Sequence, residues 1–446
     1  MVKVDYQWSA GATLSEHSRR KHKILREYFA RYLLVRCSLP RERFRVAIVD
    51  GFAGGGRYGC GASGSPLIFI EELKRGIDEI NLLRAAQGAR SIEIECLLIL
   101  NDAEEQAVTL LREVCEPRLA EIQANCPQLH IAVQYLNSEF ETVYPSIKAT
   151  VEAGKYRNVI YNLDQCGYGQ VQRSTLRDMM ASTPSAEIFY TFMIEALLAY
   201  LRKANPAFLQ TQLNPFGIDA SRLRDSDGHL SKQDWLGAAE RLVFASFHEI
   251  AAFSSPFSIN NPDGWRYWFI HFAHNYRARQ VYNDVLHQNS TFQAHFGRSG
   301  LNMLAYDPSK EGGLLYLFDV DGRTAAKDQL HEDIPRLVAE AGDVMSVQEF
   351  YDAVYNATAA HSDDIHTAML GSGELQIITP GGGERRVPNT ISVSDTLKLR
   401  SQRSLFPMFL NLPAGAWVPR PVSLPEPIAT YDREIRAEAK DPENSK

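Results

Sequence analysis

The chain has 446 residues, of which 45% are hydrophobic and 23% are charged, and its formal net charge at pH 7 is −7. This length predicts two or three domains with a sizeable core. The acidic balance excludes a polycationic surface, so any nucleic-acid contact must be a local patch. No apolar run reaches the ~20 residues of a membrane span, and the first residues lack the apolar stretch of a secretory signal.

The cysteine pattern argues against a metal site. None of the six cysteines belongs to a Cys-x-x-Cys pair or has a histidine at zinc-binding spacing. We therefore expect reduced thiols in a cytoplasmic protein, with no metal ion. The cysteines are Cys37, Cys60, Cys96, Cys115, Cys126 and Cys166.

Residues 1–40 are expected to contain a basic amphipathic helix. Within residues 13–34, Ile24, Tyr28 and Tyr32 lie at helical spacing. The first half of this helix is strongly basic, which makes it a candidate contact for the phosphates of a nucleic acid. The candidate residues are Arg19, Arg20, Lys21 and Lys23.

Residues 44–66 are the most informative segment of the chain. A β-branched run ends at Asp50, and a glycine loop follows at once. This order is typical of the first strand and loop of a nucleotide-binding α/β sheet. The three glycines at 54–56 let the backbone pass close to a ligand, because a Cβ there would clash with it. The alternative is a tight turn with no ligand. No Gly-Lys-Ser/Thr follows, which argues against a Walker-type phosphate loop.

The Asp-Gly-Phe-Ala-Gly order resembles motif I of S-adenosylmethionine-dependent methyltransferases. In these enzymes the loop wraps the methionine moiety, and the acidic residue at the strand end helps to hold its amino group. The resemblance implies S-adenosylmethionine as the cofactor. The residues that it implies as contacts are Asp50, Gly51, Phe52, Ala53, Gly54, Gly55, Gly56 and Ser65.

Strand and helix patterns alternate along residues 41–195, which predicts a mainly parallel, doubly wound sheet. A polar, helical insertion is expected over 196–262, and the sheet resumes over 263–322. The seven expected strands match the count of a Rossmann-like methyltransferase sheet. They lie at 46–50, 92–101, 129–136, 158–164, 187–194, 266–274 and 313–320, with helices at 66–75, 104–123, 140–153, 174–181 and 276–288.

Polar residues follow the second and third expected strands. Asp102, with Asn101 beside it, ends the second strand, where a carboxylate can accept two hydrogen bonds from a ribose diol. Alternatively, Asp102 caps the next helix. Asn137 or Ser138, after the third strand, either reaches the adenine amino group or caps the helix that follows.

Asp164 and Tyr168 follow the fourth expected strand. In amino-methyltransferases this position holds Asp/Asn-Pro-Pro-Tyr/Phe, where the acid accepts the N–H of the target amine and the aromatic ring stacks on an extruded base. The resemblance assigns these catalytic roles to Asp164 and Tyr168. The chain lacks the prolines and has one extra residue before the aromatic ring. The alternative is a glycine-rich loop capped by Asp164.

The segment 323–410 has the element order of a winged helix. Helices are expected at 331–341, 346–360 and 364–370, then strands at 374–378 and 390–393 around a glycine-rich tip. Arg385 and Arg386 on this tip are candidate phosphate contacts, although winged helices also serve as packing modules. Residues 411–446 are rich in proline and are expected to form an extended tail.

Taken together, the chain resembles the three-Cys-motif partner protein family, TcmP. The likeness rests on the basic helix, on the glycine loop running into Gly64-Ser65-Pro66, and on Asp164-Gln-Cys-Gly167. The family is bacterial, methyltransferase-like in fold, and named for a neighbouring radical-SAM protein, which the resemblance implies as a partner. Gly55 and Gln165 stand where the family pattern has proline.

Two functions remain open at this point. The first is methyl transfer from S-adenosylmethionine to nucleic acid or a nucleotide, in concert with a partner enzyme. The second is a methyltransferase-like module without turnover that binds a nucleotide or nucleic acid, in phage defence.

Overall fold

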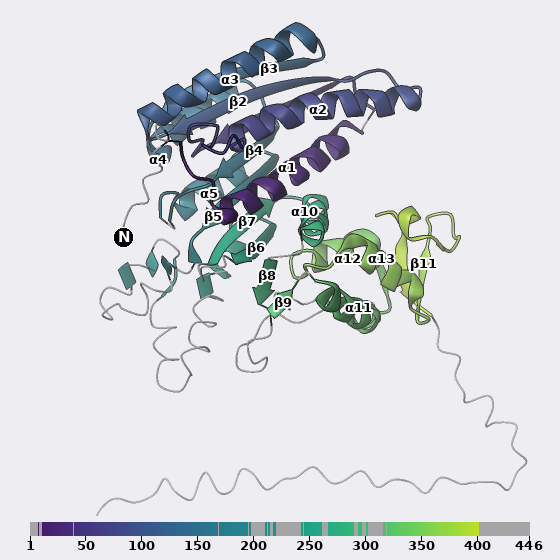
Figure 1. Ribbon diagram of the computed structural model, residues 1–446. Helices are drawn as coiled ribbons and strands as arrows, with labels where there is room; N and C mark the ends of the chain where they lie inside the picture. The colour runs from purple at the N-terminus through teal and green to yellow at the C-terminus, as the bar shows by residue number, and fades with distance from the viewer. Residues whose placement is uncertain are drawn as a thin grey trace, which may run out of the picture. The chain divides into compact units, whose positions relative to one another are not determined.

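One large β-sheet carries the candidate site (Figure 1). In this computed structural model its strand order is β3-β2-β1-β4-β5-β7-β6-β8-β9. Neighbouring strands from β3 to β5 pair in parallel, whereas the pairs from β5 to β9 are antiparallel. Helices connect the parallel strands, as in a doubly wound sheet. The predicted α/β class with a mainly parallel sheet is therefore confirmed.

The structure describes most of residues 1–400, which form one compact unit. Tyr168, most of the expected insertion and the expected tail at 411–446 lie outside the described residues. The described residues are 8, 11–38, 40–167, 169–194, 196–197, 210–211, 213–214, 217–219, 242–243, 245–260, 266–289, 293–296, 300–301, 315–317 and 319–400.

The seven expected strands lie close to their predicted positions, and the sheet has two further strands. β6 falls inside the range expected for the helical insertion, and β8 lies between the expected helix at 276–288 and the expected strand at 313–320. The expected strand at 266–274 is therefore β7, and that at 313–320 is β9. The strands are β1 Arg43–Asp50, β2 Glu93–Asp102, β3 Leu129–Asn137, β4 Asn158–Leu163, β5 Ser185–Phe192, β6 Phe253–Asn260, β7 Arg266–Ala273, β8 Gln293–Phe296 and β9 Leu315–Leu317.

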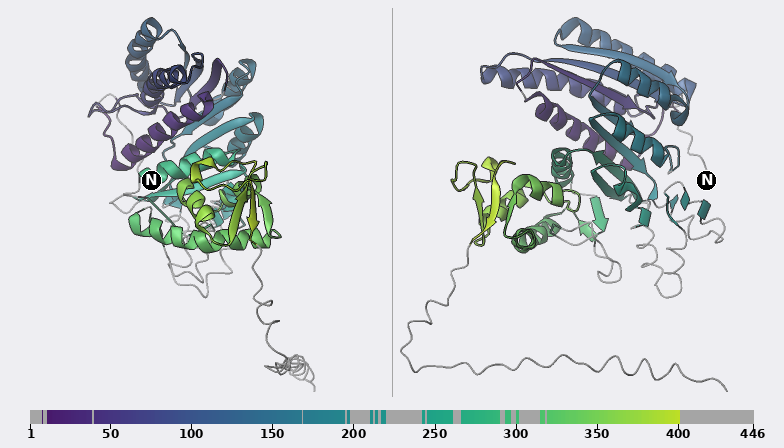
Figure 2. Two further views of the ribbon diagram at one scale, coloured as in Figure 1. Left: turned by 90° about the vertical axis from the view of Figure 1, so that its right-hand side faces the viewer. Right: turned by 180° about the vertical axis from the view of Figure 1, so that it is seen from behind.

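Helices cover both faces of the sheet (Figures 1 and 2). Alternate residues of β1 point to opposite faces: Phe44 and Val46 join the core under α1, α2, α3 and α10, whereas Ala47 and Val49 join the core under α4 and α5. These helices are α1 Glu16–Cys37, α2 Ser65–Ala86, α3 Glu105–Asn125, α4 Phe140–Ala153, α5 Arg173–Ser182 and α10 Tyr276–Gln288.

Helix α2 continues well beyond its predicted end at residue 75. Gly76 does not end the helix, because it lies where α2 packs on α1: an added Cβ would stand 2.9 Å from a methyl carbon of Leu33. The buried positions Leu73, Ile77 and Ile80 carry the helical spacing past the glycine. The glycine therefore serves close packing of two helices.

Helix α1 is anchored to the sheet by buried polar groups. The Tyr28 hydroxyl donates a hydrogen bond to the Glu187 carboxylate of β5, and His271 Nε2 of β7 lies 3.3 Å from the same carboxylate. Arg36 stands 3.7 Å from it. Burial alone raises the pKa of Glu187, but these neighbours hold that pKa below its usual value. The carboxylate is therefore charged and satisfied within the core.

The C-terminal part of the described chain combines three helices with a small antiparallel sheet of order β10-β12-β11. The strand predicted at 390–393 is wrong. The Asp395 carboxylate accepts a hydrogen bond from the Ser392 N–H, so the chain turns there and the strand forms later. The elements are α11 Val320–Glu340, β10 Val344–Ser346, α12 Val347–Val354, α13 Ser362–Gly371, β11 Leu375–Ile378, the 3-10 helix η4 Pro388–Thr390 and β12 Thr396–Leu399.

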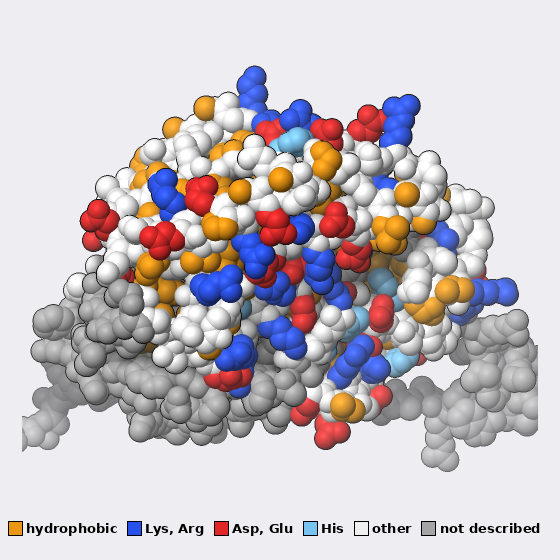
Figure 3. All heavy atoms as spheres, turned by 45° about the horizontal axis from the view of Figure 1, so that its top comes forward, with side chains coloured by type: hydrophobic (Ala, Val, Ile, Leu, Met, Phe, Trp, Pro, Cys, Tyr) orange, Lys and Arg blue, Asp and Glu red, His pale blue; other side chains and the backbone are white. Residues whose placement is uncertain are grey.

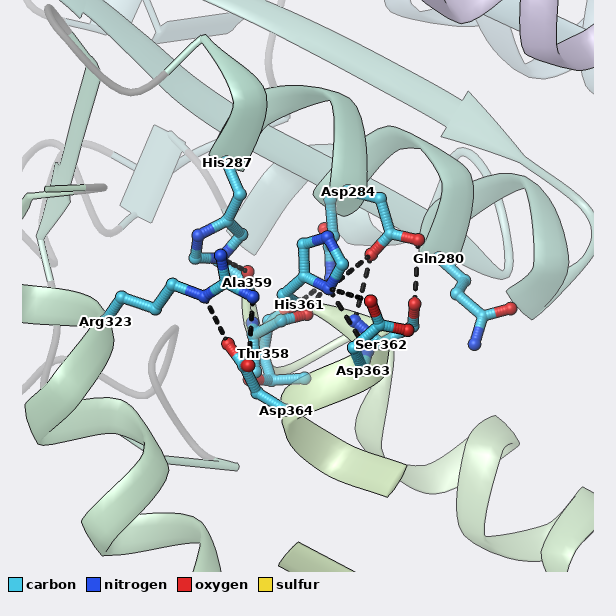
Figure 4. A network of polar contacts seen from close by, with 12 residues as sticks. Gln280, Asp284, His287, Arg323, Thr358, Ala359, His361, Ser362, Asp363 and Asp364 are labelled. Carbon is cyan, nitrogen blue, oxygen red and sulfur yellow. Dashed lines mark hydrogen bonds and ion pairs between the residues drawn. The ribbon is translucent and has the colours of Figure 1, made fainter. Parts of the chain in front are cut away.

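A polar network joins α10 to the C-terminal helices (Figure 4). The Asp284 carboxylate of α10 accepts hydrogen bonds from the Ser362 amide and hydroxyl at 2.9 and 2.8 Å. Arg323 of α11 and Asp364 of α13 form a bidentate ion pair at 2.6 and 2.9 Å. Because α10 also packs on the sheet, the C-terminal helices are part of the same compact unit.

Arg279 of α10 is fully buried and donates to the carbonyl oxygens of Tyr355 and Thr358, at 3.0 and 3.2 Å. Burial lowers its pKa to about 9, so it remains protonated at neutral pH. Arg279→Ala is expected to reduce the free energy of unfolding by about 2–4 kcal/mol, because it leaves buried carbonyls without donors and creates a cavity. Urea denaturation measures this.

The exposed neighbour Arg277 on the same helix provides the control. Arg277→Ala is expected to cost less than about 1 kcal/mol. Equal losses for the two variants would mean that the buried guanidinium does not hold the C-terminal helices onto α10.

Candidate functional site

The glycine loop after β1 is tightly folded. Gly54 and Gly56 have φ angles of +59° and +76°, the left-handed region that favours glycine. The Gly54 N–H donates to Asp102 Oδ2 at 2.8 Å, and the Gly64 N–H donates to the Gly56 carbonyl at 2.8 Å. The loop is therefore fixed to the end of β2 and to the start of α2.

Asp102 holds backbone on both sides of it. One carboxylate oxygen holds Gly54, and the other accepts the Glu104 N–H at 2.9 Å, in the turn that leads into α3. The side chain is half-buried. Because a carboxylate offers about four acceptor positions, Asp102 retains capacity for a ribose diol.

Asn101, Asn137 and Ser138 connect the ends of β1, β2 and β3. The buried Asn101 Nδ2 donates to the carbonyls of Gly51 and Ser138, at 3.1 and 2.9 Å. Asn137 Nδ2 donates to the Asp102 carbonyl at 2.9 Å. Asn101 Oδ1 is buried and has no hydrogen-bond partner among the described residues.

Asp50 lies behind the loop, fully buried. Asn162 Nδ2 donates to it at 3.1 Å, the Phe52 N–H lies 3.4 Å from it, and the Ser65 hydroxyl also bonds to it. Burial raises the pKa of Asp50 to about 7, against the opposing effect of these hydrogen bonds. In this conformation Asp50 braces the loop and the N-terminus of α2 and does not face solvent.

Trp8 covers the glycine loop. A Cβ added at Gly55 would stand 2.8 Å from the Trp8 ring, and one added at Gly54 would overlap it. A Cβ at Gly51 would meet Phe140, against which Phe52 also packs at a ring distance of 5.8 Å. The glycines therefore make room for side chains of this protein, and Ala53 is likewise buried. Sequence reasoning missed Trp8.

Asp164, at the end of β4, forms an ion pair with Lys21 of α1. The Lys21 ammonium also lies 3.4 Å from the Thr191 hydroxyl of β5, and its side chain is only 6% exposed. Burial alone raises the pKa of Asp164, but Lys21 and the hydrogen bonds from Lys21 and Thr191 hold it below its usual value. The sequence assigned Lys21 to a phosphate; the structure places it inside the site.

Two histidines of α1 flank this ion pair. The His17 ring stacks on Tyr267 of β7 at 4.4 Å, and the His22 ring lies 5.7 Å from Tyr58. Burial lowers the pKa of both histidines to about 4, so both are neutral at pH 7. Their Nδ1 atoms have no partner within the part of the chain that the structure describes.

The Gln165 side chain makes four hydrogen bonds after β4. Its side-chain N–H groups donate to the Tyr190 hydroxyl at 2.6 Å and to the Thr191 carbonyl at 3.2 Å. Its oxygen accepts the N–H groups of Gln170 and Val171, at 2.8 and 3.2 Å. The loop after β4 is therefore fixed to β5. Tyr168 lies outside the described residues.

The remaining basic candidates do not gather into one cationic surface. Arg19 and Arg20 pair with Glu16 at 3.6 and 3.3 Å, and Lys23 lies 3.9 Å from Glu27. Figure 3 shows Lys and Arg side chains interspersed with Asp and Glu on the face drawn. Charges of opposite sign at such distances cancel most of the attraction for a phosphate chain.

The tip between β11 and β12 offers one exposed cation of the two that the sequence predicted. Arg385 forms a bidentate ion pair with the buried Asp395, at 2.8 and 3.1 Å, whereas Arg386 is exposed. Helix α13, before the tip, carries Asp363 and Asp364 and no basic residue. Arg385 therefore stabilises the turn through Asp395, and Arg386 is the one arginine of this pair that is exposed to solvent.

Comparisons with known proteins leave the site to be judged on its geometry. No family model matches the chain, and no curated protein is detectably similar to it. Within the described ranges, no helix is long and apolar enough to cross a membrane, and no group of three or more His, Cys, Asp or Glu side chains is arranged to hold a metal ion.

Asp50→Asn tests the buried carboxyl at the loop. A carboxyl whose pKa rises from 3.8 to about 7 on folding stabilises the folded state most below pH 4 and loses this contribution as pH rises through 7. One pKa unit corresponds to about 1.4 kcal/mol. As the pH rises from 4 to 8, the free energy of unfolding of wild type should therefore fall by up to about 4 kcal/mol relative to that of the variant. Denaturation across this range measures the difference, and a constant difference would contradict the burial.

Gly55→Ala tests the packing of Trp8. The new methyl group would stand 2.8–3.2 Å from the indole, so the variant is expected to lose about 1–3 kcal/mol of stability. In a Trp8→Ala background the same substitution should cost little, because the obstructing ring is gone. Urea denaturation of the four proteins gives the coupling free energy. A coupling near zero would show that Trp8 does not lie on the loop.

Proposed function

We propose that this protein is an S-adenosylmethionine-dependent methyltransferase whose acceptor is an amine of a nucleic acid or nucleotide. The observation that carries the proposal is the convergence of three elements at the carboxyl ends of neighbouring parallel strands: the glycine loop after β1, Asp102 after β2 and the Lys21–Asp164 pair after β4. This edge is where open α/β sheets bind ligands.

The strand topology supports the same proposal. The order 3-2-1-4-5 is that of a Rossmann-type sheet. Two further strands, β7 and β6, form an antiparallel pair beside β5, which gives the seven strands of the methyltransferase sheet that the resemblance implies. The sheet then extends by β8 and β9.

The residues at this edge fit the cofactor. Asp102 has acceptor capacity for a ribose diol, and Asn101 Oδ1 has no partner among the residues that the structure describes. The left-handed Gly54 brings its backbone N–H against Asp102. When bound, S-adenosylmethionine supplies an electrophilic methyl group on a sulfonium. Transfer of that methyl group to an amine would also release a proton, for which the Asp164 carboxylate would be the acceptor at this edge.

The protein would contribute mainly position. Asp164, ionised and fixed at the end of β4, accepts the N–H of the acceptor amine and so keeps the nitrogen lone pair directed at the methyl carbon. Such fixed geometry lowers the barrier because the reactants need no further orientation. The neutral rings of His17 and His22 line the same region without adding charge.

The Trp8 indole lies against the glycine loop, so a ligand could reach this loop under either function only after the ring moves. A second function, a nucleotide-binding module without turnover, is favoured by the absent proline pair after Asp164. In either case the resemblance implies a radical-SAM protein as the partner.

Isothermal titration calorimetry with S-adenosylmethionine and S-adenosylhomocysteine tests the proposal. Asp102→Ala is expected to weaken cofactor binding about 10- to 100-fold, because it removes a ribose acceptor and frees the Gly54 N–H. Glu105→Ala, an exposed change in the first turn of α3, is the matched control and should bind like wild type. Unchanged affinity in folded Asp102→Ala would contradict the ribose role.

Transfer of tritium from labelled cofactor to pooled RNA, DNA and nucleotides then separates the two functions. The methyltransferase labels at least one pool, and Asp164→Ala abolishes labelling while cofactor affinity stays close to wild type. Cofactor binding without labelling of any pool would favour the binding module.

A further inference from the structure

We propose that Lys21 is a positioning residue for methyl transfer, which holds the Asp164 carboxylate in place for the acceptor amine. This inference rests on the proposed function, and it gives Lys21 a role different from the phosphate contact that its basic neighbours suggested. Lys21 comes from α1, before the first strand, and reaches Asp164 over a separation of 143 residues.

The burial of Lys21 is the first argument. An ammonium ion is costly to remove from water unless it is paired and hydrogen-bonded. Lys21 is 6% exposed, pairs with Asp164 and lies 3.4 Å from the Thr191 hydroxyl. By contrast, Lys23, two residues further along α1, is 62% exposed. Of these two lysines, only Lys21 points toward the carboxyl ends of the strands, where Asp164 lies.

The charges around Asp164 are the second argument. Among its titratable neighbours, Lys21 carries the positive charge at neutral pH, because burial keeps His17 and His22 neutral. Lys21 thus opposes the cost of burying the carboxylate. The titratable groups that interact with Asp164 are Lys21, His17, His22, Asp50 and Cys166.

The geometry around the carboxylate is the third argument. Asp164 follows β4 directly, and Thr191 of the adjacent β5 also hydrogen-bonds to it. Gln165, the next residue, is fixed by four hydrogen bonds that hold the backbone of this loop. The backbone at Asp164 is thus fixed, but the carboxyl group could still rotate or take up a proton. Lys21 restricts this rotation and keeps the carboxyl group ionised. A protonated or rotated carboxyl cannot accept the acceptor N–H in the same way.

Three variants test the role of Lys21. Lys21→Met keeps the length of the side chain and removes the charge, and Lys21→Arg keeps the charge in another geometry. Lys148→Met is the matched control, since it breaks a Lys–Asp ion pair of 2.8 Å between α4 and α5. Lys21→Met is expected to lower kcat at pH 7 about 100-fold with the dissociation constant for S-adenosylmethionine within about 3-fold of wild type. Lys148→Met should leave both unchanged.

The pH profile distinguishes positioning from a merely structural role. Without Lys21, the partly exposed Asp164 carboxyl should take up its proton at a higher pH, so the acid limb of kcat should move toward neutrality in Lys21→Met. Lys21→Arg, which keeps the positive charge, should have the acid limb of wild type. Its kcat should lie between the values of wild type and Lys21→Met. A structural defect alone would lower kcat or stability without moving the limb.

A readout independent of activity comes from thermal unfolding at pH 7. Lys21→Met and Asp164→Asn each leave one buried partner uncompensated and should lower Tm. The double variant should lose less than the sum of the two, because no unpaired charge remains. Additive losses would overturn the pairing on which the inference depends.

The outcomes separate the inference from the proposed function. Wild type that neither binds S-adenosylmethionine nor labels any acceptor would overturn the proposed function, and with it the role of Lys21 in transfer. Wild type that binds and labels, while Lys21→Met keeps the wild-type kcat and acid limb, would overturn the inference alone. A shifted acid limb together with a non-additive Tm supports it.

Discussion

The docking of α1 on the sheet is the constraint on which this structure depends. The helix precedes β1 in the chain, but its Lys21 pairs with Asp164 after β4. Its Tyr28 donates a hydrogen bond to Glu187 of β5, whose carboxylate also lies 3.3 Å from His271 of β7. Buried charges at Lys21 and Glu187 would be costly in isolation, and each has a partner on the other side of the contact. The helix therefore has one favourable placement on the sheet, and the candidate site forms where that placement brings Lys21 to Asp164.

The sequence predicted the parts of this protein that follow from local pattern. Apolar runs of β-branched residues located β1 to β5. The polar residues after them lie near one another as predicted, because parallel strands end at a common edge. The pattern was less informative where tertiary contact decides: Gly76 continues α2 because it packs on Leu33, and β6 was assigned to a helical insertion. The turn made by Asp395 displaced the last strand.

The structure adds two features to the candidate site that the sequence did not predict. Lys21 stands in a run of basic residues, and the sequence does not show which member of the run is buried. Only the fold distinguishes the buried Lys21 from Lys23. Trp8 was missed because nothing local connects it to the glycine loop 46 residues later. The glycines were interpreted as space for a ligand, and the structure fills part of that space with the protein's own ring.

The position of α1 has a consequence for how the chain reaches its native state. Its partners on β4, β5 and β7 follow it by well over a hundred residues, so the helix is synthesised long before the strands that bury its charges. Contacts of such separation slow folding, because the closure of a long loop must come before the contact stabilises it. The apolar face of α1 meets α2 early in synthesis, through Leu33 at Gly76 and Phe29 at Phe69. The buried Lys21 ammonium, by contrast, cannot meet Asp164 until the chain beyond β4 has been made.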